Sequence, residues 1–202
     1  MPGKAAIKNS LRGFLDPAVT LLVRLGVSPF AVTLAGLFVS LAGAVEIARG
    51  SLFAGGILLI VSGICDTLDG SLARRAGRES AFGAFIDSTI DRITELAYFG
   101  AIIVYYGARG EEGRIAVLLS LVALAGSFLT SYTRARAEGL GLECRVGWIE
   151  RPERVALLVL GLLLGKTALF FVIVCLAVLT TVTALQRIIH VRHVTTNKDV
   201  SG

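Results

Sequence analysis

The segment DTLDGSLARRAGRESAFGAFIDSTID, residues 66–91, places four aspartates in a chain that is otherwise strongly apolar. They form two pairs, Asp66 with Asp69 and Asp87 with Asp91. Residues three or four apart lie on one face of a helix, so each pair is expected to project from a single helix face. Apolar sequence lies on both outer sides of the segment. The four carboxylates are therefore predicted to converge where two hydrophobic helices meet.

The composition predicts an integral membrane protein. The chain has 202 residues, 54% of them hydrophobic, and its mean hydropathy is +0.76. A single soluble core does not accommodate this much apolar sequence. Six apolar segments have the length of a membrane-spanning helix or approach it. They cover residues 29–48, 51–71, 84–106, 114–135, 153–165 and 167–187.

These segments predict an all-α fold with six transmembrane helices, because none of them shows the strict alternation of a barrel strand. The fifth segment is short and needs residues from its flanks to cross a bilayer. We divide the chain into an N-terminal cytosolic segment at 1–27, a six-helix transmembrane domain at 28–190 and a polar C-terminal tail at 191–202.

The N-terminal segment contains the pattern of an amphipathic helix. Polar side chains recur every four residues, at Arg12, Asp16, Thr20 and Arg24. Apolar side chains lie between them, at Leu11, Leu15, Val19, Leu22 and Leu25. This pattern suits a helix lying at the cytosolic membrane interface, and a plain linker is the alternative.

The basic residues predict the orientation. If the N-terminus is cytosolic, then of the 20 Lys and Arg residues only Arg49, Arg109, Arg114 and Lys166 fall in outer loops, with Arg92 inside a span. This bias predicts a multi-pass protein of the cell (inner) membrane with both termini and the aspartates on the cytosolic side. Anionic membrane lipids are expected partners. Nucleic acid is not, because the basic residues are divided among several loops.

Four carboxylates at one depth in a low dielectric repel each other unless cations lie among them. Nearby arginines are one source of positive charge, namely Arg74, Arg75, Arg78 and Arg92. A transported Na⁺ or proton is a second, which would make the chain a cation or proton transporter. One or two divalent ions are the third. Ligands that are all oxygen suit Mg²⁺ or Mn²⁺, and two facing carboxylate pairs provide what a two-metal phosphoryl-transfer site needs.

The residues between the pairs favour the enzyme. Gly70 and Ala73 leave one face of the helix without bulk, so a ligand can approach the backbone, and Arg74 is placed to hold a phosphate. Gly83 permits close packing at the start of the next helix. Ion transport has no need for such a cleared strip beside a basic residue.

The full pattern resembles the signature of the CDP-alcohol phosphatidyltransferases: Asp66-x2-Asp69-Gly70-x2-Ala73-Arg74-x8-Gly83-x3-Asp87-x3-Asp91. Six spans and an interfacial N-terminal helix are also similar to that family. The resemblance implies transfer of a phosphatidyl group from a CDP-linked lipid to an alcohol, with release of CMP. It also implies a homodimer. A catalytically inactive scaffold is a further alternative, although every position of the motif is filled.

The resemblance implies a role for each motif residue. Asp66, Asp69, Asp87 and Asp91 would bind the metal, two Mg²⁺ or Mn²⁺ ions, and Asp91 would also act as the general base. The CDP-lipid would be bound by Val32, Thr33, Gly70, Arg74 and Ser80.

A second cluster of charge lies in SYTRARAEGLGLECRVGWIERPER, residues 131–154. Its arginines at 134, 136, 151 and 154 either anchor the helices at the membrane or bind an anion. Arg is well suited to phosphate because its planar fork donates two hydrogen bonds. The segment resembles the branch of the family that makes phosphatidylinositol phosphate, so Arg134, Arg136, Arg151 and Arg154 are predicted to bind a phosphorylated polyol. Inositol 1-phosphate is the first expectation and glycerol 3-phosphate the second. Phe30 departs from the pattern, since the family usually has Asn or Asp there.

Overall fold

The computed structural model describes residues 15–200, with side chains described as far as residue 196, and its regular elements over this range are all helical. A first helix covers residues 15–24. It is followed by α2 (Pro29–Ala48), α3 (Leu52–Arg75), α4 (Ala81–Gly107), the 3-10 helix η1 (Gly110–Gly113), α5 (Arg114–Gly139), α6 (Arg151–Leu164) and α7 (Lys166–Val200). The predicted all-α class is therefore confirmed for the part of the chain described.

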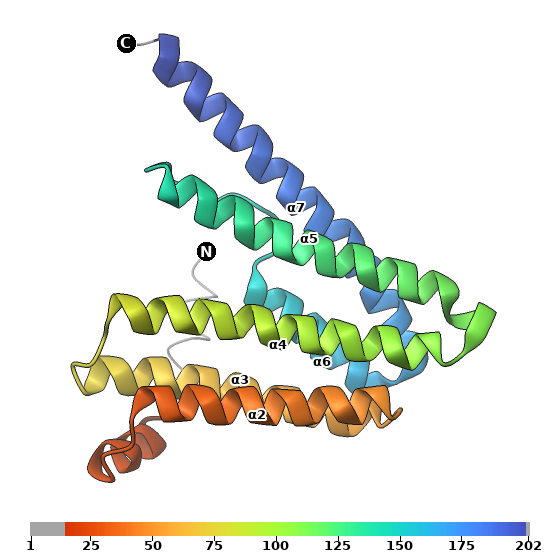
Figure 1. Ribbon diagram of the computed structural model, residues 1–202, viewed down its shortest axis with the longest axis horizontal. Coiled ribbons are helices and arrows are strands. Elements are labelled where there is room, and N and C mark those ends of the chain that lie inside the picture. Colours follow the sequence, from red (N-terminus) through yellow and green to blue (C-terminus); the bar gives the residue numbers. More distant parts are fainter. Residues whose placement is uncertain (1–14, 201–202) are drawn as a thin grey trace.

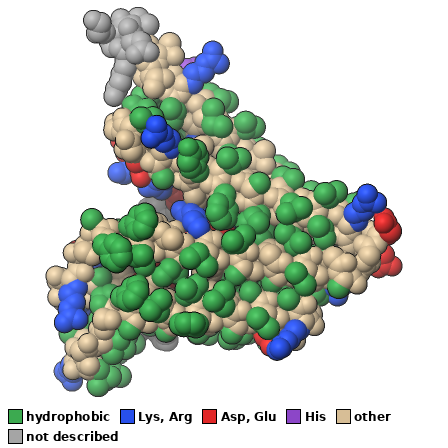
Figure 2. All heavy atoms as spheres, viewed as in Figure 1, with side chains coloured by type: hydrophobic (Ala, Val, Ile, Leu, Met, Phe, Trp, Pro, Cys, Tyr) green, Lys and Arg blue, Asp and Glu red, His purple; other side chains and the backbone are tan. Residues whose placement is uncertain are grey.

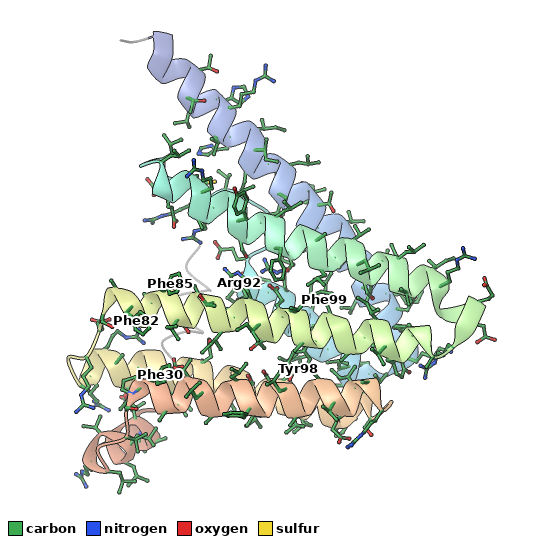
Figure 3. All side chains as sticks on the ribbon, viewed as in Figure 1. Phe30, Phe82, Phe85, Arg92, Tyr98 and Phe99 are labelled. Atoms are coloured by element: carbon green, nitrogen blue, oxygen red, sulfur yellow. The ribbon has the colours of Figure 1, made fainter. Side chains whose placement is uncertain are left out.

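The helices form two groups that meet at α4 and α6 (Figure 1). Helices α2, α3 and α4 lie side by side, and α5 and α7 pack on each other and cross this group at an angle. Helix α4 contacts α5, and α6 contacts both α3 and α7. The core between the groups includes Tyr98, Phe99, Ile102, Leu162 and Leu169, each at most 1% exposed. In Figure 3, Tyr98 points from α4 toward α2, whereas Phe99 points toward the opposite group.

A short turn between α3 and α4 brings the two aspartate pairs together. Gly77 has φ +61°, a left-handed conformation that glycine adopts without steric penalty, and it ends α3. Ser80 then caps α4, and its Oγ accepts a hydrogen bond from the Gly83 amide at 3.0 Å. Because the turn is only five residues long, the end of α3 and the start of α4 lie at the same end of the group, and both helices pack on α2.

Four of the six predicted spans are long and apolar enough to cross a membrane: Pro29–Ala48, Leu52–Arg75, Gly110–Gly139 and Lys166–Thr196. Helix α4 is long enough but is not among them, because it carries several charged residues in its first half. Helix α6 has 14 residues, about 21 Å at 1.5 Å per residue, against a hydrocarbon core of about 30 Å. It cannot borrow residues from α7, because Gly165 at φ +90° separates the two helices. One face of the molecule is broadly hydrophobic, with charged side chains gathered toward the ends (Figure 2).

The described part of the N-terminal segment is helical between residues 15 and 24, and both apolar and polar side chains of this helix contact the rest of the protein. Leu15 and Val19 are buried, and the Arg75 guanidinium of α3 contacts Asp16 at 3.4 Å and the Thr20 hydroxyl at 2.9 Å. Arg12 and Leu11 lie outside the described residues. At the other end of the chain, α7 continues through residue 190 to Val200, so no helix boundary separates the predicted polar tail from the last span.

Close packing of α5 on α7 depends on Gly126. A Cβ at this position would lie 2.2 Å from Thr180 Oγ1 and 3.2 Å from the Thr180 carbonyl carbon. Since Thr180 is fully buried and its hydroxyl bonds to the Leu176 carbonyl, neither the side chain nor the backbone can move aside freely.

We expect Gly126→Ala to destabilise the protein by about 1–3 kcal/mol, because overpacking forces the two helices apart. Thermal unfolding of the detergent-purified protein measures the effect. Gly100→Ala in α4 is the matched control, since a Cβ there meets no atom within 4 Å. The control is expected to unfold at or above the parent temperature. Equal loss of stability in both variants would contradict this account of the α5–α7 contact.

Candidate active site

Three carboxylates converge between the second half of α3 and the first half of α4. One oxygen each from Asp66, Asp87 and Asp91 lies within 4.8 Å of the others. Asp66 is in the second half of α3, and Asp87 and Asp91 are one turn apart in the first half of α4. The helical spacing and the short turn therefore place side chains from both halves of the motif at one point.

The fourth aspartate, Asp69, lies beside this triad and is more deeply buried. Its side chain is 6% exposed, and its Oδ2 has no hydrogen-bond partner in the structure. Thr33 of α2, one of the predicted lipid-side residues, interacts with the Asp69 carboxylate. A buried carboxylate oxygen without a partner is costly unless a cation or a donor satisfies it.

Arginines supply part of the positive charge that the carboxylates require. Arg151 Nη2 lies 2.6 Å from Asp91 Oδ1, and Arg151 Nη1 lies 3.4 Å from Asp66 Oδ1. Arg92 Nη1 lies 3.6 Å from Asp91 Oδ2. In Figure 3, Arg92 projects from α4 on the side of α5. Arg92 was among the arginines predicted to neutralise the aspartates, whereas Arg151 was predicted to bind the acceptor phosphate.

The donor set fits a divalent cation. The triad offers three carboxylate oxygens at close range, and Asp69 adds a buried oxygen without a partner. Hard cations such as Mg²⁺ and Mn²⁺ prefer ligands of this kind. The residues present therefore match the predicted metal site.

The residues predicted to bind the CDP-lipid lie around the ends of α2 and α3. Arg74 is exposed and lies over Gly70, because a Cβ on that glycine would be 3.5 Å from Arg74 Nη1. Arg74 also donates to Ser71 Oγ at 3.2 Å. A hollow of about 330 Å³ is lined by Asp16, Val19, Ser71, Arg74 and Arg75. The motif arginine therefore borders an open space between the first helix and α3.

The other three residues predicted to bind the CDP-lipid make contacts within their own helices. Val32 is buried in α2, and Thr33 Oγ1 donates to the Pro29 carbonyl at 3.1 Å. The Ser80 hydroxyl caps α4. Phe30, Phe82 and Phe85 are 52%, 70% and 63% exposed, at the same end of the helices (Figure 3).

The four arginines predicted to bind acceptor phosphate are not equivalent. Arg151 contacts the triad, Arg134 Nε bonds Glu138 Oε1 at 2.9 Å, and Arg136 is exposed at the end of α5. Arg154 is only 4% exposed, and its Nε lies 2.9 Å from Glu95 Oε1. Its Nη2 is buried without a hydrogen-bond partner among the described residues.

A buried polar cluster that was not predicted lies behind the triad. Glu95 Oε1 accepts from Ser127 Oγ at 2.6 Å as well as from Arg154. Arg154 Nη1 donates to Thr130 Oγ1 at 3.3 Å, and Arg187 donates to the Thr130 carbonyl. Glu95 is an acidic residue four positions after Asp91 inside an apolar segment. The four-residue spacing could have indicated Glu95 as part of the site, because it places Glu95 on the same face of α4 as the motif aspartates.

Comparisons with known proteins agree on one kind of enzyme. The family model described as CDP-alcohol phosphatidyltransferase matches residues 26–195. The chain is 40% identical over 185 residues to archaetidylinositol phosphate synthase of Methanothermobacter thermautotrophicus, covering 90% of each chain. It is 40% identical over 161 residues to phosphatidylinositol phosphate synthase of Streptomyces avermitilis, covering 77% of this chain and 66% of the relative.

Solved structures give the same relationship in three dimensions. Phosphatidylinositol phosphate synthase of Mycobacterium tuberculosis with CDP-DAG bound superposes with a TM-score of 0.80 at 36% identity, covering 87% of this chain and 92% of that one. The same enzyme in complex with manganese and citrate also superposes with a TM-score of 0.80. At 36% identity over 87% of this chain, the similarity covers the sequence as well as the fold.

We expect Asp87→Asn to weaken Mn²⁺ binding by at least ~tenfold, because an amide donates fewer lone pairs and no charge to a hard cation. Electron paramagnetic resonance of a Mn²⁺ titration measures the free ion directly. Asp16→Asn is the matched control, since Asp16 pairs with Arg75 outside the triad. An Asp87→Asn variant that bound Mn²⁺ as tightly as the parent would refute the triad as the metal site.

Proposed function

The chain belongs to the CDP-alcohol phosphatidyltransferase family, and from this membership we propose that it makes an inositol phosphate lipid. The donor is a CDP-linked lipid of the CDP-diacylglycerol type or its ether-lipid equivalent, the acceptor is inositol 1-phosphate, and CMP is released. Two relatives support this choice, since the names archaetidylinositol phosphate synthase and phosphatidylinositol phosphate synthase differ in the lipid part and share inositol phosphate.

One contact carries the proposal: Arg151 Nη2 lies 2.6 Å from Asp91 Oδ1. Arg151 Nε has no hydrogen-bond partner in the part of the chain described, so the guanidinium can donate to the phosphate of an acceptor while its Nη atoms contact the aspartates. The acceptor's free hydroxyl would then be near Asp91, which accepts its proton as the hydroxyl attacks. An acceptor that already carries a phosphate is therefore the substrate class that suits this pair of residues.

The reaction replaces one phosphate ester bond by another. The acceptor oxygen forms a bond to the lipid-bearing phosphorus of the CDP-lipid, the bond from that phosphorus to the bridging oxygen breaks, and CMP leaves with the bridging oxygen. The hydroxyl proton passes to Asp91. One or two divalent ions held by Asp66, Asp69, Asp87 and Asp91 would neutralise the pyrophosphate and stabilise the charge that develops on CMP.

We assign the CDP-lipid, which is the donor, to the side of the triad formed by α3 and the first helix. Arg74 lies over Gly70 and borders the hollow between the first helix and α3, so it can pair with the pyrophosphate while the backbone at Gly70 stays accessible. Ser80 precedes α4, and Val32 and Thr33 lie in the first turn of α2, so we assign these residues to the donor as well. The exposed Phe82 and Phe85 at the start of α4 provide an apolar rim for the acyl or alkyl chains.

We extend the proposal to the membrane arrangement. Helix α4 crosses the bilayer as well, with its charged first half at the site and its apolar second half, after Glu95, in the hydrocarbon. Helix α6 completes a six-helix bundle whose active site opens to the cytosol at the inner membrane, as the distribution of Lys and Arg favours. A homodimer is proposed from family membership.

The first test is a panel of acceptors. Purified protein with Mg²⁺ and CDP-diacylglycerol is expected to release CMP with inositol 1-phosphate and not with free inositol, and mass spectrometry of the product identifies the acceptor. If product forms only from glycerol 3-phosphate, that molecule replaces inositol 1-phosphate as the acceptor. The acceptor site then has to be explained with Phe30 where the family usually has Asn or Asp. If no acceptor yields CMP, the enzyme proposal fails and ion transport by the aspartates becomes the better explanation.

The second test concerns Arg134, which is partly exposed on the same side as Arg151. Arg134→Ala is expected to raise the KM for the phosphorylated acceptor by about tenfold, the effect of losing one charge-assisted contact, with the KM for the CDP-lipid unchanged. Arg145→Ala is the control, because Arg145 is exposed and pairs with Glu143 in the loop after α5. An unchanged acceptor KM in Arg134→Ala would remove this residue from the proposed pocket.

A further inference from the structure

The first helix, residues 15–24, is a short separate element beside the end of α3 (Figure 1). It is followed by a turn in which Gly26 has φ +68°, a left-handed conformation, before Ser28 caps α2. Leu15 and Val19, one helical turn apart, are buried and provide its apolar contact with the protein. Side-chain contacts, and not a continuous helix, therefore set the place of this element against α3.

Arg75, the last residue of α3, makes the polar contacts with the first helix. Its Nη1 donates to Thr20 Oγ1 at 2.9 Å, to the Asp16 carbonyl at 3.3 Å and to Asp16 Oδ1 at 3.4 Å. Thr20 Oγ1 itself donates to the Asp16 carbonyl at 2.8 Å, so the three oxygens form one cluster. Among the side chains that the structure describes, only Arg75 joins the first helix to another helix by hydrogen bonds.

The same two helices form the walls of the hollow that Arg74 borders. The hollow measures about 330 Å³ and is lined by Asp16 and Val19 of the first helix and by Ser71, Arg74 and Arg75 of α3. Sites for small molecules occupy about 300–1,000 Å³. The contact made by Arg75 therefore closes one side of a space that is large enough for the polar part of a ligand.

The two adjacent arginines have different partners. Neighbouring residues on a helix point ~100° apart, so Arg74 and Arg75 cannot face the same way. Arg74 lies over Gly70 and donates to Ser71 Oγ at 3.2 Å, and within the described residues it has no carboxylate partner. The charge of Arg75 is already paired with Asp16. Arg74 can therefore pair with an anion in the hollow, whereas Arg75 is committed to the first helix.

Stability is a weak explanation for the contact of Arg75. The side chains of Arg75 and Asp16 are 45% and 62% exposed, and ion pairs as exposed as this contribute little to the free energy of unfolding. Leu21 and Leu25, on another side of the N-terminal segment, are 57% and 67% exposed. These apolar side chains suit the membrane interface and can hold the segment there without Arg75. What Arg75 adds is the distance between the first helix and α3.

We propose that Arg75 is a positioning residue of the donor site, which holds the first helix as a wall of the hollow where Arg74 binds the polar part of the CDP-linked lipid. The identity of this ligand rests on the proposed function, whereas the attachment of the first helix does not. A lipid that carries a nucleotide suits such an element, because its chains remain in the membrane beside Leu21 and its polar part enters the hollow beside Val19.

Arg75→Ala tests the proposal. The KM for the CDP-lipid is expected to rise about tenfold, while the acceptor KM stays within about twofold of the parent. Thermal unfolding is expected near the parent temperature, and Mn²⁺ affinity is expected to be unchanged because Arg75 contacts none of the triad. Thr20→Val, which removes the accepting hydroxyl and keeps the branched shape, is expected to shift the CDP-lipid KM in the same direction.

Arg75→Lys is the conservative variant. All three contacts of Arg75 are made by a single nitrogen, and an ammonium group with three N–H donors can replace it. The CDP-lipid KM of Arg75→Lys is therefore expected to stay near the parent value. Arg49→Ala is the matched control, because Arg49 forms an exposed ion pair with Glu46 at the far end of α2, and it is expected to leave both KM values unchanged.

Hydrogen–deuterium exchange of residues 15–24, followed by mass spectrometry, provides a readout that does not depend on activity. Amide exchange in this helix is expected to be at least ~threefold faster in Arg75→Ala and Thr20→Val, because a helix that is released from its contacts opens more often. Arg75→Lys and Arg49→Ala are expected to exchange at the parent rate. CDP-diacylglycerol, added without acceptor, is expected to slow the exchange in the parent and to slow it less in Arg75→Ala.

Three results would overturn the proposal. In the first, Arg75→Ala leaves the CDP-lipid KM at the parent value, whether or not the helix exchanges faster. In the second, both KM values and kcat change in parallel with a loss of thermal stability, as expected of a purely structural contact. In the third, CDP-diacylglycerol does not slow the exchange of residues 15–24 in the parent. If the parent releases no CMP with any acceptor, the proposed function fails, and this last measurement alone decides whether the helix borders a site for the CDP-lipid.

Discussion

Electrostatic repulsion among carboxylates held in a poorly polarisable environment is the constraint on which the rest of the structure depends. Asp66, Asp87 and Asp91 bring oxygens within 4.8 Å of one another, beside the buried Asp69. Such a group is tolerable only with cations close by, because the attraction or repulsion between charges grows as the local dielectric falls. Arg92 of α4 and Arg151 of α6 place positive charge beside Asp91. The carboxylate oxygens of the group also suit divalent ions.

The same constraint explains why the polar contacts extend inward from the site. Arg151 reaches the aspartates from the first turn of α6, and one turn deeper Arg154 of the same helix pairs with Glu95 of α4. Ser127 and Thr130 of α5 also bond to this pair, whereas Glu95 Oε2 and Arg154 Nη2 are buried without a hydrogen-bond partner in the region that the structure describes. The buried cluster and the site are therefore parts of a single arrangement that spans α4, α5, α6 and α7.

Much of this could be predicted from the sequence. Helical spacing and the short turn made the convergence of Asp66, Asp87 and Asp91 predictable, and apolar segment lengths predicted the helices. The fate of the individual arginines could not be predicted, because it depends on how helices far apart in the chain are rotated against each other. Arg75 is adjacent to Arg74 in sequence, yet it turns to Asp16 and Thr20 while its neighbour lies over Gly70. Arg154 is buried against Glu95, a pairing across two helices that the sequence pattern does not reveal.

The shortness of α6 has a consequence for how two reactants of opposite solubility can meet. A helix of 14 residues, about 21 Å long, begins well inside the thickness that its longer neighbours cover. In a bilayer, such a helix would leave a recess on one side of the bundle, and the loop before Arg151 would line it. A water-soluble reactant could descend into this recess while a lipid-linked one slides in from the side. Neither would have to leave the phase in which it is stable.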